Sequence, residues 1–127
     1  MARNDLEDRL INFAISAVQL AEQLPKSVIG IQLSGNLIRA SSSTPLNYGE
    51  AQGAESRKDF VHKIKIVLKE LRESHAALKM VAGLNLNQHP DATQLLIKEA
   101  NELISIFVKS VQTARKNDAL MSKYKKL

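Results

Sequence analysis

Apolar residues recur at intervals of three and four along four successive stretches of the chain, the spacing of an amphipathic α-helix. The predicted helices cover about residues 5–24, 28–51, 57–83 and 90–115. No stretch alternates apolar and polar residues with the period of two expected of a strand, and no Asn-Gly or Asp-Gly hairpin turn is present. The sequence therefore predicts an all-α fold.

Residue types that favour helix ends support these boundaries. Those at helix starts are Asn4, Ser27, Ser56 and, at a first helical position, Pro90. Because short turns join long helices, sequence neighbours must run antiparallel, which predicts an up-down-up-down four-helix bundle forming a single domain over residues 1–127. Residues 116–127 form a basic tail that either extends the fourth helix or frays.

The second helix contains the unusual run Ser41-Ser42-Ser43-Thr44-Pro45. Pro45 has no backbone N–H, so in a continuous helix the carbonyl of Ser41 loses its partner and the helix is expected to kink. The neighbouring hydroxyls can satisfy that carbonyl. A break, with Thr44 as the cap of a new helix, is the alternative. The continuous, kinked helix is favoured because the apolar stripe keeps its phase across the proline.

Four polar residues of the same helix fall on one face: Arg39, Ser43, Asn47 and Glu50. Such a face can be a ligand site or can hold a catalytic carboxylate. It can also be a structural polar seam, in which Arg39 and Glu50 find partners on other helices. The seam is favoured, because no second acid, base or nucleophile accompanies Glu50.

The second and third helices together carry a specific motif. It reads Gln32-x4-Leu37-x-Arg39-Ala40-Ser41-Ser42-Ser43-x-Pro45-x-Asn47-Tyr48-x-Glu50-Ala51, then Ala54-Glu55-Ser56-x2-Asp59-Phe60-x-His62-Lys63. This motif resembles the four-helix-bundle family named for proteins encoded in intervening sequences of 23S ribosomal RNA genes. The later tracts Lys69-Glu70-Leu71-x-Glu73-Ser74 and Ala100-Asn101-Glu102-Leu103 fit the same family, so the resemblance covers essentially the whole chain. One departure is His75-Ala76-Ala77, where members often have a tyrosine and a tryptophan.

The resemblance implies a homo-oligomeric ring of such bundles, a pentamer, without enzymatic activity. It also implies a distant similarity to the accessory protein of diversity-generating retroelements, a basic ring that binds nucleic acid and a reverse transcriptase. Nucleic acid and a nucleoprotein or reverse-transcriptase-type partner are therefore expected partners by analogy of fold.

Composition and charge limit the kinds of site and the cellular compartment that can be expected. The chain of 127 residues has no cysteine, which excludes disulfides and thiolate metal sites. Acidic residues near the N-terminus and the lack of an apolar run of about 20 residues argue against a signal peptide and a membrane span, so a cytoplasmic protein is expected. The net charge of +5 is concentrated: residues 57–72 and 115–127 each carry +4.

The basic residues predict two patches that can bind phosphates. Lys58, Lys65, Lys69 and Arg72 lie along one side of the third helix. The second patch consists of Arg115, Lys116, Lys123, Lys125 and Lys126. The alternative is a solvated face with salt bridges between subunits. Only Tyr48 and Tyr124 are candidates for stacking on bases, so any binding is expected to involve the nucleic-acid backbone.

Signals for catalysis are missing. His62, His75 and His89 have no partner at a recognised metal-ligand spacing, and no Gly-rich phosphate loop or nucleophile elbow occurs. No catalytic residue, metal or cofactor is therefore predicted. Ile66, Met80 and Ile106 lie off the main apolar stripes and suggest a second apolar surface for oligomerisation. The expected function is a non-catalytic homo-oligomer that binds RNA or DNA; the alternative is a scaffold that binds no nucleic acid.

Overall fold

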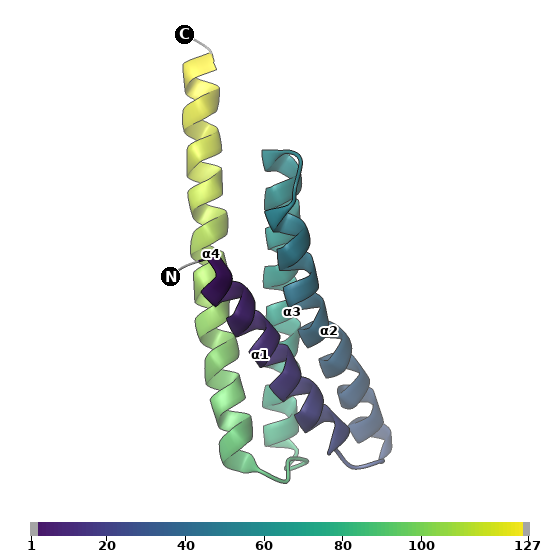
Figure 1. Ribbon diagram of the computed structural model, residues 1–127. Helices are drawn as coiled ribbons and strands as arrows, with labels where there is room; N and C mark the ends of the chain where they lie inside the picture. Colours follow the sequence, from purple (N-terminus) through teal and green to yellow (C-terminus); the bar gives the residue numbers. More distant parts are fainter. Residues whose placement is uncertain (1–2, 126–127) are drawn as a thin grey trace.

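The computed structural model describes the backbone of residues 3–125 and the side chains of residues 5–124. It contains four helices: α1 (Arg3–Glu22), α2 (Val28–Gln52), α3 (Arg57–Gly83) and α4 (Pro90–Lys125). The described part of the chain has no strand. The all-α prediction is therefore confirmed, and Figure 1 shows each helix running opposite to the one before it.

Local sequence determines where the helices begin and end. The hydroxyl of Ser27 accepts a hydrogen bond of 3.1 Å from the backbone N–H of Gly30, and that of Ser56 accepts one of 3.0 Å from Asp59. Both serines therefore act as N-caps, because they satisfy N–H groups that the first turn leaves free. Asn4 does not precede α1 as expected, since that helix already begins at Arg3.

The core is formed where consecutive helices pack. Every helix contributes side chains that are completely buried, such as Leu10, Leu37, Leu71 and Leu103. The rings of Tyr48 from α2 and Phe107 from α4 meet edge to face, with centroids 5.8 Å apart, and join helices that are not neighbours in sequence. Helix α1 packs mainly on α2 and touches α4 much less. It crosses the bundle obliquely, so it diverges from α4 towards its C-terminal end (Figure 1).

Helix α2 is continuous through Pro45. The hydroxyl of Thr44 donates a hydrogen bond of 2.9 Å to the carbonyl oxygen of Ser41, the acceptor that Pro45 leaves without an N–H partner. The alternative of a break at Thr44 is therefore not observed, because this residue lies inside the helix instead of capping a new one. A kink at Pro45 stays a prediction.

Helix α4 extends well beyond its expected end near residue 115. It has 36 residues, about 54 Å of helix, whereas α1 has 20 residues, about 30 Å. Its last turns project past the other three helices (Figure 1). The segment after residue 115 has no proline or glycine, and it contains four lysines, two leucines, an alanine and a methionine, which favour helix. The basic tail is therefore helical as far as Lys125, while Lys126 lies outside the described residues.

Candidate nucleic-acid interface

Lys58, Lys65, Lys69 and Arg72 form an outward-facing row on α3. All four are exposed, and the spacing of seven, four and three residues keeps them within about 40° of Lys58 around the helix. Among the described residues none of the four makes an ion pair. Their positive charges are therefore available to a partner.

The cations that face a neighbouring helix behave differently. Arg9 of α1 binds Glu99 of α4 at 2.7 Å, and Arg57 of α3 binds Asp118 of α4 at 2.9 Å. Arg39 of α2 binds Glu73 at 2.6 Å and Glu70 at 3.2 Å, both on α3. Glu70 and Glu73, which lie next to Lys69 and Arg72 in the sequence, are therefore paired with Arg39. Ion pairs between helices thus neutralise these three arginines, whereas the four cations of the α3 row make none with the described residues.

The row on α3 is longer than the sequence analysis recognised. His62 and Lys79 are exposed and continue the same spacing of three, four and seven residues. From Lys58 to Lys79 the row spans about 32 Å of helix. His62 was missed because the charge count treats histidine as neutral, and Lys79 because it lies between Leu78 and Met80, beyond the charged segment of residues 57–72.

A second row of exposed lysines runs along α4: Lys98, Lys109, Lys116 and Lys123. The last three recur every seven residues, so they share one side of the helix. Lys98 and Lys109 were missed because the tail was treated separately from the helix that carries it. Arg115 is exposed, the side chain of Lys125 is not described, and Lys126 is outside the described residues.

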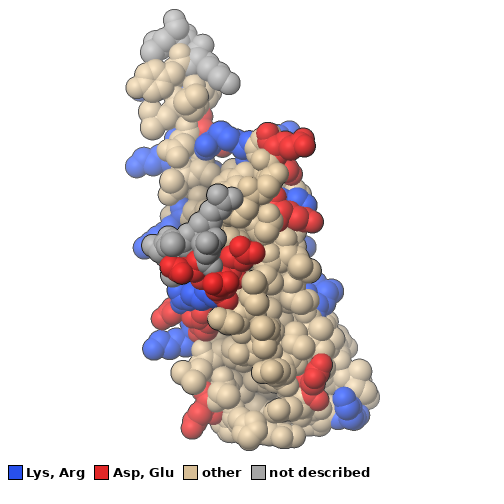
Figure 2. Space-filling view, viewed as in Figure 1, with Lys and Arg blue, Asp and Glu red and all other residues tan. Residues whose placement is uncertain are grey.

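The two rows lie on helices that pack against each other, since α3 contacts α4 and Arg57 of α3 pairs with Asp118 of α4. We call the outward surfaces of these two helices together the α3–α4 basic face, defined by Lys58, His62, Lys65, Lys69, Arg72 and Lys79 of α3 and by Lys98, Lys109, Lys116 and Lys123 of α4. Figure 2 views the molecule from the α1 side and shows lysine and arginine, interleaved with aspartate and glutamate, along its α4 edge, with a broad uncharged surface beside it.

The polar seam of α2 is engaged within the protein. Arg39 and Glu50 both bind α3, the latter through Lys63 at 2.7 Å. Ser43 donates to the carbonyl of Ala40, and Asn47 donates to that of Ser43. These contacts form a clamp between α2 and α3. Arg39 and Glu50, at its two ends, bind side chains of α3, whereas Ser43 and Asn47, in its middle, bind backbone carbonyls of α2.

The clamp shifts the pKa values of two carboxyl groups in opposite directions. Burial, with a smaller effect of the hydrogen bond to Glu73, raises the pKa of Glu70 above its ordinary value. The hydrogen bond from Arg39 lowers the pKa of Glu73. A buried glutamate with a raised pKa can mark a catalytic site, but here it arises from a contact between two helices.

The histidines lie apart, as their spacing predicted. His62 is exposed on α3, His75 is half-buried on the same helix, and His89 lies in the turn before α4. Within the described residues no cluster of three or more histidine, aspartate and glutamate side chains has the geometry of a metal site. None of the described helices has the length and apolarity needed to span a membrane.

The comparisons with known proteins agree with this architecture. Residues 4–109 match the family described as 23S rRNA-intervening sequence protein. The match includes all of α2 and α3 and most of α1. The chain belongs to this family. No curated protein matched the chain.

A solved structure has the same fold as this 23S rRNA-intervening sequence protein. It is the crystal structure of a protein with unknown function from the S23 ribosomal protein family of Bacteroides thetaiotaomicron. The TM-score is 0.72 at 23% sequence identity, and the alignment covers 84% of this chain and 97% of that one. The family match stops at residue 109, so Lys116 and Lys123 lie in a part of α4 beyond it.

Proposed function

We propose that this 23S rRNA-intervening sequence protein is a non-catalytic, homo-oligomeric helical bundle that binds the backbone of RNA or DNA. The observation that carries the proposal is the α3–α4 basic face, whose cations are exposed and make no ion pair with described residues. A row about 32 Å long matches the extended charge of a nucleic-acid backbone better than a single small anion.

Binding through this face requires phosphates and not bases. Its members are lysine, arginine and histidine; of the two tyrosines, Tyr48 is buried in the core, and Tyr124 alone is exposed, next to Lys123 near the end of α4. Release of counterions from the nucleic acid then supplies most of the free energy of binding. We therefore expect weak sequence preference and a steep decrease of affinity with salt concentration.

Self-association is supported by the opposite side of the bundle. Arg39 and Glu50 are the only charged residues of α2, and both form ion pairs with α3, so the exposed surface of this helix has no unpaired charge. Large apolar side chains are exposed on α1 and α2: Ile11, Ile15, Val28, Ile31 and Leu46. Such a surface can meet a copy of itself without repulsion between like charges, whereas two basic faces cannot.

The apolar surface expected from Ile66, Met80 and Ile106 has less support than the exposed apolar residues of α1 and α2. Ile106 packs against the protein's own core, and Met80 is exposed on the outward side of α3 among the cations. The exposed residues of α1 and α2 replace them as the basis for the proposed oligomer. A pentameric ring, which the family resemblance implied, remains part of the proposal.

The test is fluorescence anisotropy with labelled duplex DNA and structured RNA, titrated through increasing salt. The test variant replaces Lys58, Lys65, Lys69 and Arg72 with glutamine, and the control replaces the three lysines with arginine, which keeps the charge. For duplex DNA, losing four phosphate contacts should flatten the log–log salt slope by about 3–4. The arginine control should bind like the wild type.

Light scattering of the same variants separates this function from a scaffold role. If the glutamine variant keeps its oligomeric state but no longer binds nucleic acid, the cations of the basic face bind phosphates. If the wild type binds no nucleic acid at low salt and the glutamine variant dissociates, the cations serve contacts between subunits and the proposal is wrong.

A further inference from the structure

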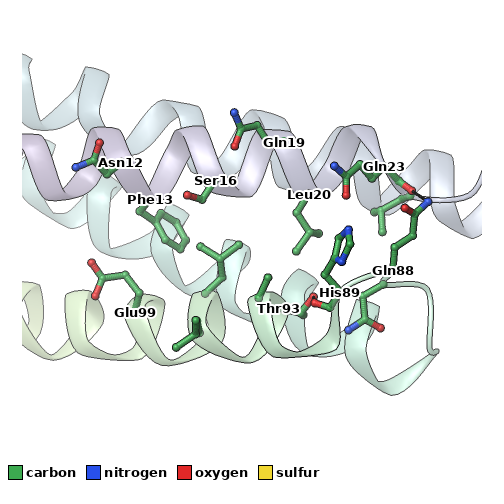
Figure 3. A pocket seen from close by; sticks show the side chains of 15 residues that line it. Asn12, Phe13, Ser16, Gln19, Leu20, Gln23, Gln88, His89, Thr93 and Glu99 are labelled. Carbon is green, nitrogen blue, oxygen red and sulfur yellow. Dashed lines mark hydrogen bonds between the residues drawn. The ribbon is translucent and has the colours of Figure 1, made fainter.

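A wedge-shaped pocket lies between α1 and the start of α4, outside the basic face. Its volume is about 490 Å³, within the usual range for small-molecule sites. It exists because α1 diverges from α4 after the ion pairs of Arg9 (Figure 1). In Figure 3, Phe13 and Leu20 point from α1 towards α4, while Thr93 and Glu99 point back from α4.

Contacts between helices close both ends of this α1–α4 pocket. At one end Arg9 donates hydrogen bonds of 2.8 and 2.7 Å to the carboxylate of Glu99. At the other, the side-chain amide of Gln88 donates to the backbone carbonyl of Gln23 at 3.2 Å. Between these contacts the α1 wall is about 21 Å long, from Arg9 to Gln23, and the α4 wall is about 14 Å long, from Pro90 to Glu99. A partner helix, about 10–12 Å wide, would need a groove open at its ends, so the shape favours a small group.

The chemistry of the lining indicates an uncharged occupant. The apolar part is formed by Phe13, Leu20, Leu24, Ala92, Leu95 and Leu96. Five side-chain amides accompany it: Asn12, Gln19, Gln23, Asn87 and Gln88. Among the described residues no lysine or arginine lines the pocket, the charge of Glu99 is already compensated by Arg9, and the one basic side chain of the lining is the imidazole of His89. The site therefore offers apolar contact and hydrogen bonds, to which His89 can contribute, but no lysine or arginine for a phosphate.

We propose that the α1–α4 pocket binds a nucleobase. A base has apolar ring faces, which suit the leucines and Phe13, and polar edges, whose donors and acceptors pair with side-chain amides. The amides of Asn12 and Gln19 make no hydrogen bond with described residues, so they are available for such pairing. Both lie at the outer edge of the pocket, and Gln19 turns away from it in Figure 3, so it must rotate to pair.

The base can belong to a free nucleoside or to an unpaired nucleotide of RNA, and the second case rests on the proposed function. Lys98 precedes Glu99 on α4 and is exposed on the outward side of that helix. Lys98 lies at least about 100° around α4 from the pocket-lining Ala92, Leu96 and Glu99, so a strand held by the lysines of α4 would have to cross this helix to place a base in the pocket. This arrangement separates the two parts of a nucleotide, with phosphates on the cations and the base between the helices.

The first experiment titrates the protein with adenosine, guanosine, cytidine and uridine, observed by NMR of its methyl groups. We expect saturable shifts of the methyl signals of Leu20, Thr93 and Leu96 with at least one nucleoside. The variant Ala92→Phe fills the pocket, and Ala119→Phe is the matched control on the same helix. The shifts should disappear in the first and persist in the second. No shift with any nucleoside would overturn binding of the free base.

The second experiment compares RNA duplexes with and without a single-nucleotide bulge. The wild type should bind the bulged duplex about tenfold more tightly, in line with the free energy of stacking one base. Ala92→Phe should remove that difference and leave duplex binding and its salt slope unchanged. If both RNAs bind equally and no nucleoside binds, the inference fails while the basic face stands. If nucleosides bind but neither RNA nor duplex DNA does, the pocket stands and the proposed function fails.

Discussion

The hydroxyl of Thr44 replaces the backbone N–H that Pro45 denies to the carbonyl oxygen of Ser41, through a hydrogen bond of 2.9 Å. Both Ser41 and Thr44 are completely buried, so water cannot take over this role. An unsatisfied carbonyl in such a place costs free energy comparable to a lost hydrogen bond. The threonine thus allows a proline in the middle of a 25-residue helix.

Replacing Thr44 with valine, which has nearly the same shape, should lower the free energy of unfolding by about 1–3 kcal/mol. The reason is that the carbonyl of Ser41 remains buried without a donor. The cost should shrink when Pro45 is also replaced by alanine, since residue 45 then donates its own N–H. A double-mutant cycle by urea denaturation measures this coupling.

Thr44→Ser is the control, because it keeps the hydroxyl and removes only a methyl group. If Thr44→Val lowers the free energy of unfolding equally with proline and with alanine at position 45, the hydroxyl does not stabilise the Ser41 carbonyl.

Glu70→Gln should become more stable relative to the wild type as pH rises above about 4.5. Burial raises the pKa of Glu70 in the folded state above its ordinary value of 4.5, so folding retains a proton that the unfolded chain has released. The contribution of Glu70 to stability is therefore lost as pH rises through the folded pKa. Glutamine does not titrate and escapes this loss. Urea denaturation at a series of pH values measures the difference.

Glu73→Gln supplies a comparison of opposite sign. Arg39 lowers the pKa of Glu73, so its stabilisation is present above 4.5 and is lost as pH falls through the lowered folded pKa. Parallel pH profiles for the two variants would contradict the assignment of Glu70 as the desolvated member of the pair.

The protein should lose stability as pH falls below about 6.5, in part because of His75. Burial, with a smaller effect of Lys79, lowers the pKa of His75 from its ordinary value of 6.5. Between the two values the unfolded chain binds a proton that the folded chain does not, so stability rises with pH there. His75→Gln should flatten this part of the profile. A folded-state NMR titration in which the His75 signals move at or above pH 6.5 would refute the explanation.

Alanine at Gly35 or Gly49 should raise the stability of the single chain by about 0.5–1 kcal/mol each. Both lie inside α2, and an added Cβ would meet no atom within 4 Å. If the outward surface of α2 packs closely against another copy, the same substitutions should weaken self-association. Thermal unfolding and light scattering of the variants measure the two effects.

Gly30 is the matched control on the same helix. A Cβ there would collide with the carbonyl oxygen of Pro25, so alanine should destabilise the protein instead. A gain in stability at Gly35 and Gly49 with unchanged oligomerisation would remove these glycines from the proposed subunit interface.

Much of the fold could be predicted from local signals. The apolar stripe of α2 keeps its phase across Pro45, which favoured a continuous helix, and the serines at 27 and 56 mark helix starts by satisfying free N–H groups. The end of α4 was harder to locate. The exposed Leu120, Met121 and Tyr124 give a weak helical pattern there, because they contact no core in the described chain.

The sequence by itself determined the elements and the α3 row of cations, since both depend on spacing along a single helix. Only the tertiary structure decided which charges are neutralised, because Arg39 and Glu70 are 31 positions apart and meet through the packing of α2 on α3. The same holds for the α1–α4 pocket, whose two walls come from opposite ends of the matched region. Its existence depends on the angle between two helices, and no local residue pattern encodes that angle.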